Sequence, residues 1–106
     1  MLTRHYTSGA SPYEAAYGFS RAIRVGNRIL VSGTAPIEEL GGTAADVVRT
    51  RMFITDPADA DAVGAVHGEI FGEVRPAATM VVISALLRAE WRIEIEAEAL
   101  VGDDPA

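Results

Sequence analysis

The sequence predicts an α+β fold in which several strands form one sheet and a helix covers one face of it. Three observations support this prediction. Residues 91–101 alternate between apolar and charged side chains, which is the period of a strand with one buried face. Residues 57–72 carry apolar residues at helical spacing, and three strand-like segments precede them. The predicted order is strand, strand, strand, helix, strand, strand.

The N-terminal part is predicted to be an arm followed by a β-hairpin. Residues 1–16 show no period, and we expect them to form a loosely held arm. Residues 17–25 (YGFSRAIRV) and 28–34 (RILVSGT) are predicted strands, and the Gly-Asn pair between them is a turn signal. Pro36 is predicted to end the hairpin, because proline has no backbone N–H to donate.

Residues 46–55 (DVVRTRMFIT) are predicted to form the third strand. Arg49 and Arg51 share one face of this strand with Val47 and Phe53. We expect the two arginines to lie on the sheet face that carries the glutamates of residues 91–101. There they either form cross-strand ion pairs or bind a ligand, since arginine prefers planar partners such as carboxylates.

The helix is predicted to begin at Asp56, an N-cap carboxylate, with Pro57 at the first helical position. It is predicted to end near Gly72. Its apolar side chains fall at i, i+3, i+4, i+7, i+8 and i+11, so they form one stripe. Because His67 lies on this stripe, we interpret it as a histidine at the edge of the core. The stripe consists of Val63, Val66, His67, Ile70, Phe71 and Val74.

Two strands of different character are predicted in the last third of the chain. Residues 79–83 (TMVVI) form a nearly continuous apolar run after Pro76, which predicts a central strand buried on both faces. In residues 91–101 the charged side chains point away from the apolar ones. Three glutamates on one face repel one another, so they need water, arginines or a function. The charged residues are Arg92, Glu94, Glu96 and Glu98.

The segment between Pro36 and Asp46 is unusually short. IEELGG at 37–42 resembles the last turn of a helix and its glycine stop, but no beginning of that helix is present. A crossover between parallel strands also needs a dozen or more residues. Either the strands are joined differently, or a loop and a helix near residues 36–40 are missing from the sequence. We expect a chain break or an abnormal connection there, and an intact mass of 11.2 kDa would exclude a missing segment.

Composition excludes several classes of protein and site. A chain of 106 residues is expected to be a single domain, 1–106, and no apolar run is long enough to cross a membrane. Without cysteine or lysine, disulfides, thiolate chemistry and Schiff bases are excluded. The net charge of −6 disfavours nucleic acid as a partner. No signal peptide, metal motif or phosphate loop is visible, so we expect a cytoplasmic protein without a metal or cofactor.

Four stretches of the chain resemble the RidA (YjgF/YER057c/UK114) family. They are GFSRAIRVGNRILVSGTAP, ADVVRTRMFITD, HGEIFGEVRPA and WRIEIEAEALV, and they cover most of the chain in order. The resemblance implies a chorismate-mutase-like fold, which is a mixed sheet with helices on one face, assembled as a homotrimer. In that trimer the other sheet faces meet around a three-fold axis, and clefts between subunits hold small ligands.

The resemblance also implies an activity. The RidA subgroup hydrolyses 2-imino or enamine acids, released by pyridoxal-phosphate enzymes, to 2-oxo acids and ammonia. Carried over residue by residue, the resemblance makes Glu94 the water-positioning residue and makes Ser32 and Gly33 line the cleft. Phe19 falls where the active subgroup has a tyrosine, so one polar contact is absent. The residues alone allow a plainer interpretation, in which Glu94 is a solvated glutamate and Ser32 a structural hydroxyl.

One departure separates the chain from the classical imine-deaminase subgroup. There, the arginine that binds the substrate carboxylate lies two residues after a proline, and this chain has Ala78 at that position. Arg75 is nearby, and it either forms a displaced anion site or closes the C-terminus of the helix. Two functions stay open. One is a hydrolase of imines that binds a small carboxylate or carbonyl metabolite at subunit interfaces; the other is a non-catalytic binding or regulatory trimer.

Overall fold

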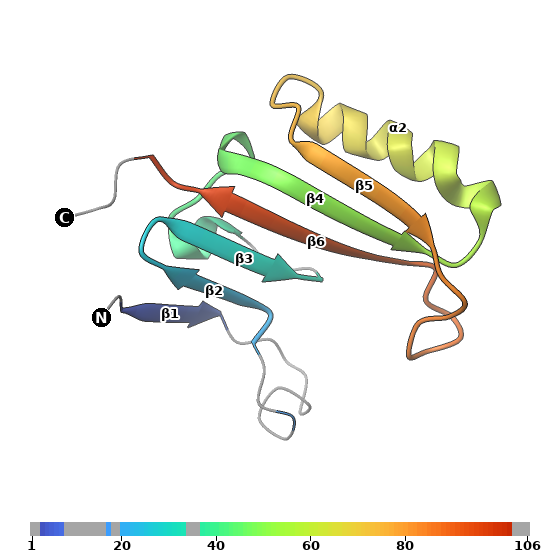
Figure 1. The fold of residues 1–106 in the computed structure, drawn as a ribbon, viewed down its shortest axis with the longest axis horizontal. Helices are drawn as coiled ribbons and strands as arrows, with labels where there is room; N and C mark the ends of the chain where they lie inside the picture. Colours follow the sequence, from blue (N-terminus) through green and yellow to red (C-terminus); the bar gives the residue numbers. More distant parts are fainter. Residues whose placement is uncertain (1–2, 8–16, 18–19, 34–36, 103–106) are drawn as a thin grey trace.

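A single mixed sheet forms the body of the protein, and one helix lies beside part of it (Figure 1). The computed structural model describes residues 3–7, 17, 20–33 and 37–102. The six strands lie in the order β1-β2-β3-β6-β4-β5; β4 and β5 are parallel and the other neighbours antiparallel. This confirms the predicted α+β class. The strands are β1 (Arg4–Thr7), β2 (Ala22–Val25), β3 (Arg28–Ser32), β4 (Val47–Ile54), β5 (Ala77–Val82) and β6 (Ile93–Leu100).

β6 confirms the strand predicted from the alternating pattern, and it lies between β3 and β4. Its residues Ile95, Ala97 and Ala99 belong to the sheet face on the side of α2 (Ala60–Phe71), which we call the helix face. Thr50 identifies this side, because it pairs with Ala97 and its hydroxyl lies 2.7 Å from His67 Nε2 on α2. The glutamates of β6 and both arginines of β4 lie on the opposite, open face, as predicted.

The buried core lies on the helix face, beneath two short 3₁₀ helices. These are η1 (Ile37–Leu40) and η2 (Ala44–Asp46). Arg24 of β2 reaches into this region, where its Nη1 donates a hydrogen bond of 2.8 Å to the Leu40 carbonyl oxygen. The arginine thus fixes η1 to the sheet. The core cluster consists of Ala22, Ile29, Leu40, Val47 and Ala99.

Residues 33–46 join β3 to β4, which β6 separates in the sheet. In the described part, residues 37–46, the connection consists of η1, a turn at Gly41 with φ +85°, and η2. A Cβ atom at Gly41 would lie 2.8 Å from Arg24 Nη1, so a side chain there displaces the guanidinium. The strands are therefore joined differently from a helical crossover. Pro36 lies outside the described residues, and the loop and helix missing near residues 36–40 stay a prediction.

The N-terminal prediction is wrong for residues 4–7, which form β1 at one edge of the sheet. β1 pairs with β2 along its whole length, from Arg4 opposite Val25 to Thr7 opposite Ala22. The side-chain pattern does not show this strand, because its ladder uses backbone groups that almost every residue has. Residues 8–16 lie outside the described residues. The hairpin is confirmed as β2 and β3, with Gly26 at φ +60° in the turn.

β5 is an edge strand, which corrects the prediction of a central strand at residues 79–83. Among the described strands it pairs with β4 alone. Val81 and Val82 are 40% and 54% exposed. The apolar run predicted burial on both faces because parallel strands usually have it, whereas β5 has a neighbour on one side only. An apolar edge strand is a site for association with another chain.

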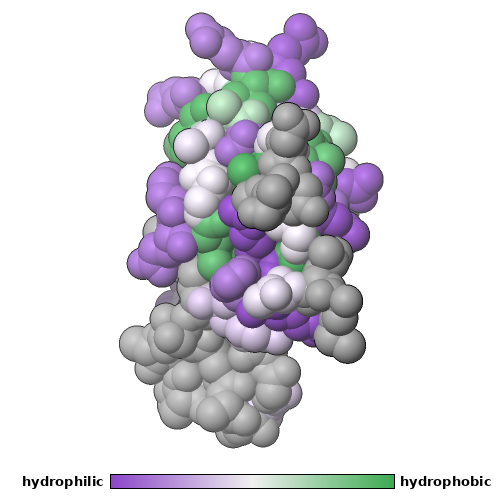
Figure 2. All heavy atoms as spheres, turned by 90° about the vertical axis from the view of Figure 1, so that its left-hand side faces the viewer, coloured by the Kyte–Doolittle hydropathy of each residue, from purple (hydrophilic) through white to green (hydrophobic). Residues whose placement is uncertain are grey.

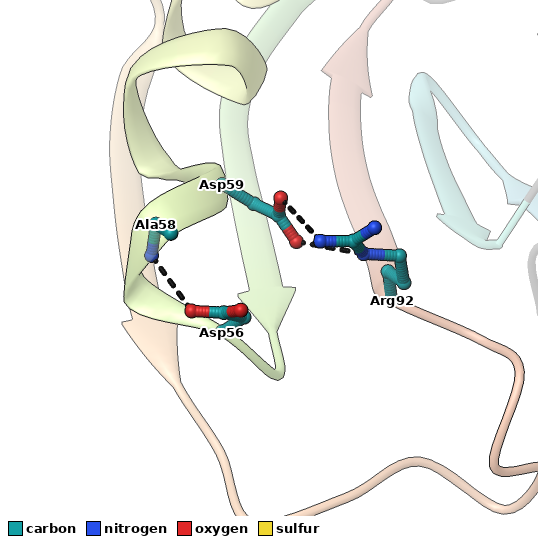
Figure 3. Close-up of polar contacts among 4 residues, drawn as sticks. All are labelled: Asp56, Ala58, Asp59 and Arg92. Carbon is teal, nitrogen blue, oxygen red and sulfur yellow. Dashed lines mark hydrogen bonds and ion pairs between the residues drawn. The ribbon is translucent and has the colours of Figure 1, made fainter.

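The helix begins as predicted. The Asp56 carboxylate accepts a hydrogen bond of 2.9 Å from the N–H of Ala58, and Pro57 opens the 3₁₀ helix η3 (Pro57–Asp59) that leads into α2. Arg92 donates two hydrogen bonds to the Asp59 carboxylate, 2.8 and 3.0 Å long (Figure 3). This pairing fixes the start of α2 to the residue before β6. It also engages Arg92 with Asp59, although the pattern placed Arg92 in one row with the glutamates.

Only part of the predicted apolar stripe of α2 is covered. Val63, His67 and Phe71 are half-buried, whereas Val66 and Ile70 are 54% and 56% exposed. The His67 ring lies 4.8 Å from the Phe71 ring and bonds Thr50, which fits the interpretation of a core-edge histidine. The apolar stripe of α2 is wider than the part of the helix surface that the sheet covers. Apolar area on α2 is therefore left at the surface.

Candidate functional site

The open face carries a depression of about 230 Å³ over β2, β3, β6 and β4. One part of its wall is apolar and comes from Ile23 and Leu30. The other part is polar and charged, because successive side chains of β4 and β6 alternate between the two faces. The full lining is Ser20, Arg21, Ile23, Leu30, Val31, Ser32, Arg49, Arg51, Glu96, Ala97 and Glu98.

Cross-strand pairing arranges the open face in rows. The Ser32 row runs from Ser32 through Glu96 and Arg51 to Thr79, on four neighbouring strands. The Leu30 row runs beside it and contains Ile23, Leu30, Glu98, Arg49 and Ala77. Neighbouring strands are about 4.8 Å apart, so the backbones of Ser32 and Arg51 are separated by about 10 Å. The depression lies on these two rows.

The ion pairs of the two rows are unequal. Glu98 accepts a hydrogen bond of 2.9 Å from Arg28 Nη2. Glu96 lies 3.9 Å from Arg51 Nε, which is too long for a hydrogen bond. Arg51 and Glu96 keep 50% and 41% of their side-chain surface exposed. The predicted ion pair is therefore found for Arg51, which it holds only loosely. Arg49 has no ion pair in the described residues, and Glu98 pairs with Arg28 instead.

Gly33 lies at the end of β3, against a third arginine. Its φ is +78°, and its N–H donates a hydrogen bond of 2.8 Å to the Ile95 carbonyl oxygen. A Cβ atom at Gly33 would lie 3.5 Å from Arg21 Nη1, so the guanidinium of Arg21 lies close to this glycine. The N–H of Ser32 bonds the Arg21 carbonyl oxygen at 2.7 Å. Ser32 and Gly33 thus lie beside a cationic side chain.

Glu94 lies on the open face, two residues before Glu96 and opposite Phe53. It is exposed and does not line the depression. Within residues 20–33 and 37–102, Glu96 and Glu98 each have an arginine within ion-pair distance, and Glu94 has none. Because Ile95 receives the Gly33 hydrogen bond, Glu94 also adjoins the end of β3.

The remaining predicted site residues lie apart from the depression or outside the described residues. Arg75 has φ +55°, is exposed, and donates its N–H to the Phe71 carbonyl oxygen at 2.8 Å, so it closes the end of α2. It does not line the depression. Ala78 is the ladder partner of Thr50 on the neighbouring strand. Phe19 lies outside the described residues. No cluster of three or more metal-ligating side chains occurs in the described part of the chain.

The model of the endoribonuclease L-PSP family matches residues 37–101, which is more than half of the 106 residues. The chain belongs to this family. Among curated relatives, an uncharacterized protein of Streptomyces coelicolor is 33% identical over 125 residues, covering 93% of this chain and 92% of its own. A RutC family protein of Pyrococcus abyssi is 32% identical and covers 76% of this chain and 84% of its own.

A solved structure confirms the resemblance on which the site residues were carried over. It is a YjgF/YER057c/UK114 family member from Mycobacterium tuberculosis, 36% identical, with a TM-score of 0.86. It covers 93% of this chain and 100% of its own. The yeast protein Mmf1 shares the L-PSP fold with a TM-score of 0.80, although only 18% of residues are identical and 94% of this chain and 100% of that one are covered.

The comparison with the Streptomyces protein also bears on the short connection. That alignment runs over 125 positions and this chain has 106 residues, so at least 19 positions have no counterpart here. A difference of this size corresponds to a loop and a short helix. The alignment length does not give its place, and the loop and helix missing near residues 36–40 stay a prediction.

Sequence reasoning missed one arginine of the depression and its apolar wall. Arg49, Arg51 and Ser32 were found from the two-residue period and from the family pattern. Arg21 was not singled out, because only the hairpin register brings it beside Gly33. Ile23 and Leu30 alternate with helix-face residues on both hairpin strands, and that alternation is the signal that predicts their face.

Proposed function

We propose that this L-PSP family protein binds a small 2-oxo or 2-imino carboxylic acid on the open face and hydrolyses the imine or enamine form to the 2-oxo acid and ammonia. The observation that carries the proposal is Glu94, the one glutamate of β6 without an ion pair in the described residues. A carboxylate that is engaged by arginine is a poor proton acceptor. Glu94 is free to accept a hydrogen bond from water.

The reaction requires few groups from the protein. An enamine first takes a proton from water on its β-carbon and becomes the protonated imine. Glu94 accepts a proton from a water molecule while the water oxygen bonds to the imine carbon and the C=N electron pair moves to nitrogen. Glu94 returns that proton to the nitrogen of the carbinolamine, the C–N bond breaks to release ammonia, and the hydroxyl proton passes to water as the C=O bond of the 2-oxo acid forms. A positioned general base typically accelerates such a step about 10²–10⁴-fold. The Ser32 hydroxyl supplies a hydrogen-bond donor or acceptor on the same face, whereas the N–H groups of Ser32 and Gly33 are already donated to the Arg21 and Ile95 carbonyl oxygens.

We further propose that the site is completed in a homotrimer. The support is the apolar surface that one chain leaves exposed, on the open face at Leu30 and on the edge strand at Val81 and Val82. Figure 2 shows hydrophobic residues at the surface among hydrophilic ones on one end of the molecule. Single chains rarely expose large contiguous apolar patches, and a second copy removes them from water. Clefts between subunits then enclose the depression.

A non-catalytic binding or regulatory trimer is the alternative. It is favoured by Ala78, which takes the place of the arginine that binds the substrate carboxylate in the imine-deaminase subgroup. A role on RNA, suggested by the family description, is disfavoured by the net charge of −6, because binding to phosphate backbones depends on cationic surface. No described helix is long and apolar enough to cross a membrane, and we propose a cytoplasmic location.

Imine hydrolysis is tested by generating 2-imino acids in situ with an amino-acid oxidase and following 2-oxo acid formation. The purified protein is expected to accelerate formation, and Glu94→Gln is expected to lower that acceleration about 100-fold. Glu39→Gln serves as a matched control, because Glu39 is also an exposed glutamate but lies on η1, away from the open face. No acceleration with small, branched or aromatic imino acids would favour the non-catalytic alternative.

A further inference from the structure

Resting on the proposed function, we propose that Arg51, supported by Arg49 and Arg21, holds the carboxylate of the ligand in the depression. The family pattern gives this task to an arginine at the position of Ala78 on β5. Here the cationic group comes from the neighbouring strand β4 and from the residue before β2. The ligand class is a short aliphatic 2-oxo or 2-imino monocarboxylic acid.

The charge balance of the depression favours an anion. Three arginines line it, Arg21, Arg49 and Arg51, against the two glutamates Glu96 and Glu98. Glu98 is already engaged at 2.9 Å by Arg28, which does not line the depression. One glutamate therefore remains for three guanidinium groups. The depression carries net positive charge on a chain whose overall charge is −6.

Arg51 is the lining arginine that lies on the row of Ser32, and it is only loosely held. Its Nε is 3.9 Å from Glu96 Oε1, and no hydrogen bond from its guanidinium to a described residue is present. Half of its side-chain surface is exposed. A planar guanidinium with free donors binds a carboxylate through two parallel hydrogen bonds. The exposed pair between Arg51 and Glu96 is too long to have this geometry. A ligand carboxylate can supply the partner that Glu96 supplies only in part.

The Ser32 row gives the orientation of the ligand. Ser32 and Arg51 lie on the same row with one strand between them, about 10 Å apart at the backbone. Because the arginine side chain spans much of that gap, a carboxylate bound to Arg51 brings the adjacent carbonyl or imine carbon toward Ser32, Gly33 and the Glu94 end of β6. The apolar wall of Ile23 and Leu30 then receives a short alkyl group. A volume of about 230 Å³ suits a metabolite of this size.

The plainer interpretation of Arg51 is a cross-strand ion pair with Glu96. This interpretation and ligand binding by Arg51 predict different results for the substitution Glu96→Gln. If Arg51 serves the ion pair, Glu96→Gln leaves ligand binding unchanged. If Arg51 binds the ligand, Glu96 competes with the ligand carboxylate, and Glu96→Gln tightens binding. Glu96 therefore provides a test that does not depend on removing the arginine.

The experiment titrates the intact protein with 2-oxobutanoate, and with butanone as a neutral molecule of the same carbon length, by isothermal calorimetry or NMR. We expect 2-oxobutanoate to bind and butanone to bind at least tenfold more weakly. Arg51→Gln is expected to raise the Kd of 2-oxobutanoate at least tenfold, with a smaller change for Arg51→Lys, and Glu96→Gln to lower it several-fold. Circular dichroism and size-exclusion profiles confirm that each variant is folded and assembled.

Arg88→Gln is the control. It removes the same charge from an exposed arginine that lies outside the lining of the depression and pairs with Glu90, which does not line it either, so its Kd should stay within twofold. Equal Kd values for wild type, Arg51→Gln and Arg88→Gln would overturn the inference and leave the proposed function standing. Equal weakening by both arginine variants would also overturn it, because it would show a general charge effect. Absence of 2-oxobutanoate binding to the wild type would overturn both proposals.

Discussion

β6 and β5 are the two strands of the last third of the chain. The more apolar of the two, β5, lies at the edge of the sheet, and the more charged, β6, lies in its middle. β6 carries glutamates at positions 94, 96 and 98, whereas β5 is an almost unbroken apolar run. A central strand needs ladder partners on both sides, not apolar side chains on both faces. Apolar content reports what a strand finally contacts, and for β5 we propose that this includes the surface of a second copy of the chain.

The comparison also separates two kinds of stabilisation. β6 contributes Ala99, fully buried, to the core and pairs with β3 and β4. β5 pairs with β4 alone and leaves half of Val82 exposed. The loss of a β6 residue should therefore cost the fold of the chain, and the loss of a β5 residue should cost association between chains.

The largest effect is expected for Ala99→Asp in β6. The side chain has no exposed surface, so the substitution places an unpaired carboxylate in the core. We expect a loss of about 4 kcal/mol or more of unfolding free energy, enough to unfold most of the protein. Urea denaturation followed by circular dichroism measures it. A stability close to that of the wild type would contradict the central place of β6.

An intermediate effect is expected for Thr50→Val, on β4 next to β6. The substitution keeps the shape of the side chain but leaves Nε2 of the half-buried His67 without its 2.7 Å partner. The expected loss is about 1–3 kcal/mol of unfolding free energy. His67→Leu in addition should recover part of it, because both polar partners are then absent. Additive losses in the double variant would mean that the hydrogen bond contributes nothing.

The smallest effect on the fold is expected for Val82→Asp in β5, where the side chain is exposed. Its circular dichroism spectrum should match that of the wild type. The molar mass in solution should fall from about three times 11.2 kDa to a single chain, because a charge enters the proposed interface. Sedimentation equilibrium measures both proteins. A wild type that is monomeric, or a variant that stays trimeric, would contradict the role given to β5.

The sequence predicts the elements of this fold better than their arrangement. Alternation along β6 predicts the face of Glu94, Glu96 and Glu98, and the same rule on β4 places Arg49 and Arg51 opposite them. The spacing of apolar residues along a strand does not specify which strands become its neighbours. The predicted central position of β5 is therefore wrong. β1 has no apolar period to detect, and its ladder with β2 uses backbone groups that almost every residue has.

The candidate site divides in the same way. Ser32 and Arg51 were found because each carries its own signal, a turn motif or a strand period. Their common row across Glu96 depends on the register of three strands, which single-sequence patterns do not specify. Arg21 has no signal of its own, because it approaches Gly33 only after the hairpin has formed.

The place of β6 between β3 and β4 has a consequence for synthesis and folding. β1–β3 and β4–β5 share no ladder with each other, and both depend on a strand that leaves the ribosome after them. Until residues 93–100 are available, the strands of the nascent chain can pair only within two separate groups, each with an unpaired inner edge. Unpaired edges are templates for aggregation, so completion of the final strand decides whether the chain closes on itself or on a neighbour.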